Sequence, residues 1–150
     1  MFDEKYTEIV EPKYGIKRDF THDEILTNNI YKKHHYSIDE EHRVDMTSYD
    51  TYSIDPDGCI DADDAFSIYT EDDKLYFAIH IADPTEYIEL NSTLWDDIVN
   101  RTTTKYPSNR KPIHMMPNKV LALSSLQGDH RGNIKKAITI LTEIHKTSFE

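Results

Sequence analysis

Two neighbouring runs of alternating apolar and polar residues limit the folds open to this chain of 150 residues. The first run is AFSIY at residues 65–69, and the second is KLYFAIHIA at residues 74–82. Side chains of a β-strand point alternately to the two faces of a sheet, so this alternation indicates strands. The TEDD between the runs supplies a polar turn. The sequence therefore predicts a β-hairpin.

Helices are expected on both sides of the hairpin. THDEIL offers Thr21 as an N-cap with Glu24 three residues later, which predicts a helix over 21–33. A second helix is expected to have Ser92 or Thr93 as its N-cap and to run through LWDDIVNRTTTKY. The three prolines that follow mark a loop, and NKVLALSSL, at residues 118–126, is a candidate short helix.

A closing strand completes the expected fold, because KKAITILTEIH at residues 135–145 alternates again. The mixture favours an α+β domain with a largely antiparallel sheet and flanking helices. We divide the chain into an N-terminal polar segment at 1–20 and one domain at 21–150. The expected parts of this domain are a leading helix at 21–33, a loop and hairpin at 50–90, a helix and loop at 92–118, and a strand at 135–145.

Charge is unevenly distributed along the chain. The net charge of −11 weighs against a simple nucleic-acid coat protein, because such proteins are basic overall. Between residues 39 and 73 the only Lys or Arg is Arg43, whereas residues 101–136 hold eight Lys and Arg against the single acid Asp129. An acidic centre followed by a basic segment suits an anionic substrate brought to a metal ion. The alternative is that both are solvated faces.

Cysteine usage and hydropathy bear on the compartment. Cys59 is the only cysteine, which excludes a disulfide framework and favours a reducing, cytoplasmic compartment. The first residues lack a basic-then-apolar signal pattern, and no apolar run approaches membrane-spanning length. We therefore expect a cytoplasmic protein with no membrane partner.

The stretch SIDPDGCIDADDAF, residues 53–66, is the densest acidic segment of the chain. Carboxylates crowded in this way raise one another's pKa, and a bound cation relieves the repulsion. The segment is therefore either a solvated loop or a cation site with oxygen ligands. Its five aspartates are Asp55, Asp57, Asp61, Asp63 and Asp64.

One cation site on this stretch is an EF-hand calcium loop. With Gly58 at position six of twelve, Asp55 and Asp57 fall at positions three and five and Asp64 at position twelve. Position one is then Ser53, which offers no carboxylate. An EF-hand also needs a helix on each side of its loop, and the residues that follow alternate like strands. The EF-hand is therefore kept as the second alternative function.

The other cation site is a magnesium centre built from Asp55, Asp61, Asp63 and Asp64. One of these acids follows a strand and three lie in a bend, where adjacent carboxylates can converge. Hard oxygen ligands without an adjacent His or thiolate pair select Mg²⁺ or Mn²⁺ over Zn²⁺. Phosphodiester hydrolysis uses such sites, with paired ions roughly 3.5–4 Å apart.

Several short motifs occur in an order that resembles the catalytic RNB domain of the ribonuclease II/R family. The resemblance covers residues 14–144 and corresponds to the N-terminal part of that domain. The segments that carry it are YGIKRDFTHDEIL, RVDMT (43–47), SIDPDGCIDADDA (53–65), HIADPTEYI (80–88), TTTKYPSNRKPIHMMP (102–117), ALSSL (122–126) and KKAITILTEI.

The resemblance implies Mg²⁺-dependent, processive 3′→5′ hydrolysis of single-stranded RNA to nucleoside 5′-monophosphates. It assigns Asp55, Asp61, Asp63 and Asp64 as metal-site and catalytic carboxylates, with Asp64 the most critical for cleavage. It also assigns Tyr106 as the aromatic side chain that stacks on a terminal base.

Other residues of these motifs receive lesser roles. Lys105, Arg110 and Lys111 are candidate phosphate contacts. Asp57 is expected to serve the turn, and structural roles are expected for two residues of HIADP, His80 and Asp83.

The family's domain continues beyond the motifs found here, and no cold-shock or S1 module is recognisable in the chain. We therefore expect a fragment, a split gene product or a decayed copy. We also expect self-association, or a partner chain that supplies the rest of the domain. The first alternative function is a non-catalytic RNA- or metal-binding module, and turnover by the 150 residues alone is left open.

Overall fold

The structure of the protein is a computed structural model that describes Phe20 and residues 43–59, 61–106, 108, 111–127 and 134–145. These residues form two compact units. One unit contains Phe20 and the described residues of 87–120, and the other contains the described residues of 37–86 and 121–150. The helix expected over 21–33 lies outside the described residues. The division of the chain at residue 20 stays a prediction.

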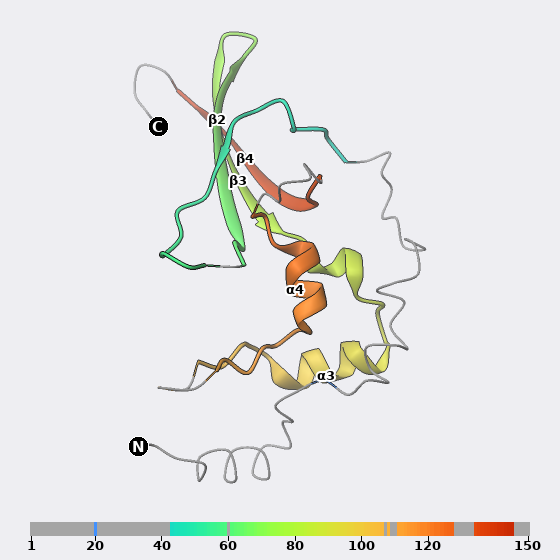
Figure 1. The fold of residues 1–150 in the computed structure, drawn as a ribbon. Coiled ribbons are helices and arrows are strands. Elements are labelled where there is room, and N and C mark those ends of the chain that lie inside the picture. The colour runs from blue at the N-terminus through green and yellow to red at the C-terminus, as the bar shows by residue number, and fades with distance from the viewer. Residues whose placement is uncertain are drawn as a thin grey trace. The chain divides into compact units, whose positions relative to one another are not determined.

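The second unit is built on a four-stranded sheet with the strand order β1-β2-β3-β4, in which each neighbouring pair is antiparallel (Figure 1). An α+β fold with an antiparallel sheet is thereby confirmed, and the closing strand lies where the alternation predicts it. The strands are β1 (Thr51–Tyr52), β2 (Asp64–Glu71), β3 (Lys74–Ala82) and β4 (Ala137–Ile144).

The predicted hairpin is formed by β2 and β3, and its turn is tighter than the sequence suggests. Glu71 pairs with Lys74, which leaves only Asp72 and Asp73 as the connection. Their φ angles are 47° and 62°. A type I′ turn needs positive φ at both central positions, and its twist matches that of the flanking strands. Aspartate enters this region more readily than most residues because its short side chain hydrogen-bonds locally.

The two faces of the sheet differ in composition. On one, which we call the small-residue face, Ala65, Ser67, Ala78, His80 and Ala82 are all buried. The register of the strands places the isoleucines of the sheet on the opposite, aliphatic face, and several of these are 40–58% exposed. Leu141, Tyr69 and Tyr76 share the small-residue face. The aliphatic face consists of Tyr52, Phe66, Ile68, Phe77, Ile79, Ile81, Ile138 and Ile140.

Helix α3 (Thr93–Arg101) belongs to the first unit and has Ser92 as its N-cap. The Ser92 hydroxyl accepts a hydrogen bond from the backbone N–H of Trp95 at 3.1 Å, as one of the two expected caps requires. The helix ends five residues before the predicted end at Tyr106. Thr102 has a φ of 66°, which a β-branched residue adopts only with strain and which a continuing helix cannot use.

The core of the first unit forms around α3. Its buried members are Ile88, Leu94, Ile98 and Val120. The expected short helix is confirmed as α4 (Asn118–Ser124), and a 3-10 helix, η3 (Pro84–Tyr87), was not expected. Across the described part of the chain, every helix is too short or too polar to cross a membrane.

Arg101 joins α3 to the loop that follows it. Its side chain is 1% exposed and donates to the Asp97 carboxylate at 3.2 Å and to the carbonyl oxygen of His114 at 3.1 Å. The guanidinium also lies 3.9 Å from the centre of the Phe20 ring. A buried arginine with these partners has a structural function, so it is not available to a phosphate.

Candidate metal centre

The acidic loop lies within residues 53–66, and its first part, up to Cys59, is a tight turn. The backbone N–H of Cys59 donates to the carbonyl oxygen of Pro56 at 3.1 Å, and Gly58 has a φ of 82°. Positive φ at the third residue is the requirement of a type II turn, which glycine meets without strain. Asp57 is the other central residue. The expected turn role of Asp57 agrees with this geometry.

The second part of the loop, residues 61–64, carries Asp61, Asp63 and Asp64 on a backbone that is held in place at Ala62. Ala62 is 2% exposed. Its N–H donates to the Ser125 hydroxyl oxygen at 3.1 Å, and its carbonyl oxygen accepts from the N–H of Leu126 at 2.8 Å. Anchoring this one residue from both sides holds the acids before and after it.

The next two residues are tied to β3. The carbonyl oxygen of Asp63 accepts from the N–H of Ala82 at 2.8 Å, and Asp64 opens β2 opposite Ile81. The sheet therefore sets the positions of both backbones. Their side chains are exposed, so they are accessible to solvent and to a ligand.

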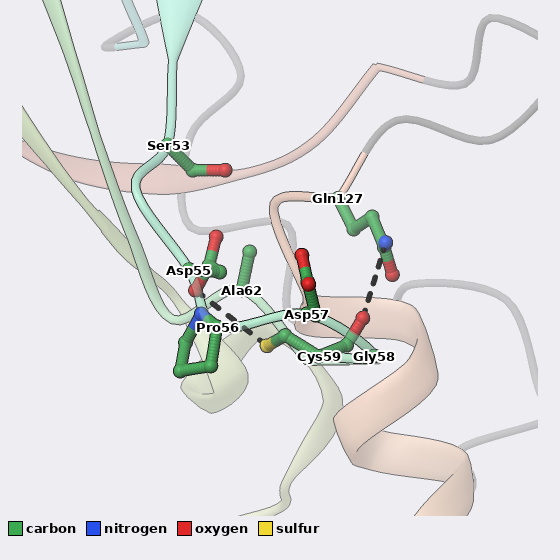
Figure 2. Close-up of a pocket in the computed structure, with 8 residues that line it drawn as sticks. All are labelled: Ser53, Asp55, Pro56, Asp57, Gly58, Cys59, Ala62 and Gln127. Atoms are coloured by element: carbon green, nitrogen blue, oxygen red, sulfur yellow. Dashed lines mark hydrogen bonds between the residues drawn. The ribbon is translucent and has the colours of Figure 1, made fainter.

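Gln127 is hydrogen-bonded to the first part of the loop. Its side-chain amide donates to the carbonyl oxygen of Cys59 at 3.3 Å, and the Cys59 thiol donates to Asp55 at 3.5 Å (Figure 2). These residues border a pocket of about 320 Å³. Asp55 is the one predicted metal ligand on the wall of this pocket. The pocket is lined by Ser53, Asp55, Pro56, Asp57, Gly58, Cys59, Ala62 and Gln127.

Three of the predicted acids act electrostatically on the fourth, Asp63. Nearby atoms partly desolvate the Asp63 carboxylate although its side chain is exposed, which raises its pKa, and the charges of Asp61, Asp64 and Asp55 raise it further. Across the described ranges, however, no three His, Cys, Asp or Glu side chains are arranged to hold a metal ion. The carboxylates are therefore crowded without converging. Their chemistry fits a hard cation such as Mg²⁺.

The predicted RNA contacts lie in the unit that contains α3. Tyr106 is 75% exposed, as a stacking platform would need to be. The Lys105 ammonium donates to the carbonyl oxygens of Arg101, at 2.8 Å, and Thr103, at 3.5 Å. Lys105 therefore caps the end of α3. Lys111 is exposed, and Arg110 lies outside the described residues.

The strands around the acidic loop exclude the EF-hand arrangement. β1 precedes the loop and β2 begins at Asp64, the residue that an EF-hand reading would place at position twelve. A calcium loop of that class is followed by a helix. The EF-hand alternative is therefore wrong.

Sequence reasoning missed a buried charge network beside the loop. Arg43, in RVDMT, donates to the Asp83 and Glu86 carboxylates at 2.9 Å each. The Asp83 and Glu86 side chains are only 5% and 2% exposed. Asp83, in HIADP, also accepts from Thr85, and its N–H donates to the carbonyl oxygen of Lys136. The motif positions of Arg43 and Asp83 were the only signal in the sequence.

The pKa of Asp83 reflects its partners. Burial alone would raise it, but hydrogen bonds from Thr85 and Arg43 and the charge of Arg43 outweigh burial, so the pKa is below its ordinary value. The carboxylate is therefore ionised at neutral pH. Asp83 is a structural residue at the end of β3, as expected.

The chain belongs to the family of proteins that contain the RNB domain. The family model matches residues 43–149. The chain is 32% identical over 101 residues to the 3′-5′ exoribonuclease HELZ2 of Mus musculus. It is 40% identical over 65 residues to exoribonuclease 2 of Buchnera aphidicola subsp. Cinara cedri. These stretches cover 66% and 43% of this chain.

A solved structure shows the same fold. RNase R of Mycoplasma genitalium, in complex with ribose-methylated single-stranded RNA, matches 91% of this chain with a TM-score of 0.69 and 20% identity. The match covers 21% of that chain. The mouse and Buchnera proteins are likewise matched over 3% and 10% of their lengths. This chain therefore spans a small part of each protein that it resembles.

Proposed function

We propose that this chain carries the metal-binding part of a 3′→5′ exoribonuclease domain that hydrolyses single-stranded RNA to nucleoside 5′-monophosphates. The observation that supports it most strongly is that the charges of Asp55, Asp61 and Asp64 act on Asp63 in a member of the RNB family. The relatives named above are exoribonucleases, and the structural neighbour is bound to RNA. The first alternative, a binding module without turnover, uses the same acids.

The proposed cofactor is Mg²⁺, with Mn²⁺ as a substitute. Asp55, Asp61, Asp63 and Asp64 would hold it through carboxylate oxygens. A bound ion of this kind activates water and stabilises the leaving oxygen of a phosphodiester. The chain contributes a fixed backbone at Ala62 and β2, which limits the reorganisation that the acids need.

The remaining proposals concern RNA, partners and location. Tyr106 would stack on a base, a contact worth about 1–3 kcal/mol. Lys105, Arg110 and Lys111 would contact phosphates, although the bonds of Lys105 to the end of α3 leave it less available. We place the protein in the cytoplasm because Cys59 is a free thiol. We also propose that the aliphatic face is covered by a second copy or by a partner chain that completes the domain.

Metal titration tests the site. We expect calorimetry to show Mg²⁺ or Mn²⁺ binding in preference to Ca²⁺, since the acidic loop lacks the flanking helices of a calcium site. Asp64→Asn should weaken Mg²⁺ binding by roughly tenfold or more. The matched control is Asp57→Asn, which removes the same charge from the same loop at a turn position and should change affinity less. Equal losses in the two variants would contradict the assigned ligand set.

The reaction is tested with single-stranded RNA labelled at its 5′ end and protein in excess. We expect slow, Mg²⁺-dependent shortening from the 3′ end with nucleoside 5′-monophosphates as products. Asp64→Asn should abolish it, because the change removes a metal ligand and little volume, and circular dichroism should show an unchanged fold. If Asp64→Asn cleaves as fast as the parent, the catalytic assignment is wrong. Metal and RNA binding without any cleavage would favour the binding module.

A further inference from the structure

A chain of side-chain hydrogen bonds crosses all four strands on the small-residue face of the sheet. The Thr51 and Ser67 hydroxyl oxygens are 2.9 Å apart, and Ser67 Oγ is 3.0 Å from His80 Nε2. His80 Nδ1 is 2.9 Å from the hydroxyl oxygen of Thr139. Ser67 is 0% and His80 7% exposed, so water cannot readily replace these bonds. We call these four residues the hydroxyl–histidine ladder.

The hydrogen bonds of Thr51 determine which group donates and which accepts in the rest of the ladder. Thr51 also donates its hydroxyl proton to the carbonyl oxygen of Tyr49, at 3.2 Å. A carbonyl oxygen can only accept, and a hydroxyl has one proton to give. Thr51 must therefore accept from Ser67. Ser67 has then used its own proton, so it must accept from His80.

We propose that His80 is neutral and carries its proton on Nε2, and that this tautomer is selected by a carbonyl group two strands away. Nε2–H then donates to Ser67, and Nδ1 accepts from the hydroxyl group of Thr139. All hydrogen bonds of the ladder run in one direction, from β4 through β3 and β2 to β1. The reversed ladder would leave the Tyr49 carbonyl without the Thr51 proton.

The ladder makes the sheet sensitive to protons. A proton taken up at Nδ1 changes Thr139 from donor to acceptor, and because Thr139 is exposed, its hydroxyl can turn to water. The imidazolium would stay buried, and burial already holds the pKa of His80 below its ordinary value of 6.5. Near neutral pH the ring is therefore uncharged in the folded protein.

Charged and titratable groups flank the ladder at both ends of the sheet. The register and the ring contacts place the phenols of Tyr49, Tyr69 and Tyr76 toward the hairpin turn, where Glu71 and the Lys74–Glu143 ion pair also lie. Arg43, Asp83 and Lys136 lie at the other end, where β3 ends. The cause of the lowered His80 pKa is burial.

The ladder has a structural consequence for the acidic loop. β1 contains only Thr51 and Tyr52 and pairs with β2 through two residue pairs. Three residues later the chain reaches Asp55. The ladder is a second link that holds β1 to the sheet, so it helps to fix the start of the loop. This inference concerns the fold and does not depend on the proposed function.

Nitrogen–proton NMR of the imidazole rings in the full chain tests the proposal. In the parent protein near neutral pH, we expect His80 to show a protonated Nε2 and an unprotonated Nδ1. Thr51→Val removes the link to the Tyr49 carbonyl without touching His80. Since one net hydrogen bond then no longer favours one direction, the ratio of the two tautomers should shift toward Nδ1–H by roughly five- to tenfold.

Two controls accompany Thr51→Val. Thr51→Ser keeps the hydroxyl and should restore the parent tautomer ratio. Thr142→Val makes the same chemical change on β4, on the opposite face of the sheet, and should leave His80 unaffected. A parent protein with the proton on Nδ1 would overturn the proposal, as would an unchanged ratio in folded Thr51→Val. If Thr51→Val does not fold, the tautomer measured in the parent protein decides whether the proposal holds.

A pH titration of the same ring signals adds an independent arm. The pKa of His80 should lie below 6.5, so the unfolded chain binds a proton at a higher pH than the folded chain does. The contribution of His80 to stability is then complete above 6.5 and is lost as the pH falls from there through the lower pKa of the folded protein. A His80 that titrates at or above 6.5 would contradict a ladder that keeps the ring neutral.

Discussion

Replacing Arg43 with methionine is expected to lower the free energy of unfolding by about 3 kcal/mol at neutral pH. The change leaves the Asp83 and Glu86 carboxylates buried without the guanidinium that donates to both at 2.9 Å. Removing one partner of a buried ion pair typically costs about 3–5 kcal/mol. We take the lower end because the Arg43 side chain is 23% exposed, so water can reach part of the site. Denaturant unfolding followed by circular dichroism measures the loss.

Two comparisons separate burial from charge. Lys74→Met breaks the ion pair with Glu143, whose two side chains are 53% and 52% exposed, and should cost at most about 1 kcal/mol. Arg43→Lys keeps the charge but cannot form the same two-carboxylate bridge, so an intermediate loss is expected. An Arg43→Met variant that is as stable as Lys74→Met would show that the buried network contributes little.

The pH dependence has a defined sign. The pKa of Asp83 is below its ordinary value in the folded parent, so its contribution to stability is present above about 3.8 and is lost as the pH falls through the folded pKa. Without Arg43, only the hydrogen bonds from Thr85 oppose the effect of burial, so the pKa of Asp83 should be higher than in the parent, which favours the protonated form. The stability difference between the parent and Arg43→Met should therefore shrink as the solution is acidified.

The elements that could be predicted from the sequence are those that local residues determine. Alternation over 65–69 and 74–82 gave the hairpin, and Ser92 gave the start of α3. The end of α3 was missed because the φ of Thr102 depends on its surroundings and not on residue type alone. The Asp72–Asp73 turn was placed correctly but was predicted two residues too long, since Thr70 and Glu71 still pair with β3 as part of β2.

The acids of the candidate site could be predicted from the sequence, but the residues that hold the acidic loop in place could not. Charge and spacing identified Asp55, Asp61, Asp63 and Asp64. The other three raise the pKa of Asp63, which agrees with a common site. The residues that brace the loop come from distant segments. Ser125 lies 63 residues from Ala62, and Asp83 lies 40 residues from Arg43. No local pattern reports such pairings, because they depend on the path of the whole chain.

The bracing explains how a loop rich in like charges can be held in one place. Repulsion among the acids favours opening of the loop, and no Lys or Arg in the described ranges forms an ion pair with any of the four. Neutral groups supply the restraint: the Ser125 hydroxyl, the Leu126 N–H and the end of β3. Because these groups add no positive charge, they do not compete with a cation for the carboxylates.

The 150 residues assayed by themselves are expected to degrade RNA at least about 10²-fold more slowly than a longer ribonuclease of the family. Phosphoryl transfer needs fixed positive charge near the reacting phosphate, and losing one such group typically costs about 10²–10³ in rate. Here no described Lys or Arg pairs with the acids, and the net charge of −11 repels RNA at long range. The basic residues of 101–136 can offset this repulsion only locally.

A time course with Mg²⁺ at low salt, run beside RNase R under the same conditions, measures this difference. Light scattering on the same samples reports association, which we expect because side chains of the aliphatic face such as Ile138 and Ile140 are 57% and 58% exposed. Salt screens both the long-range repulsion and the contacts of the basic segment, so slower cleavage at higher salt would show that the basic contacts dominate binding. A monomer that removes many nucleotides per minute from the 3′ end would contradict this expectation. Positive charge would then have to reach the four acids from residues outside those described.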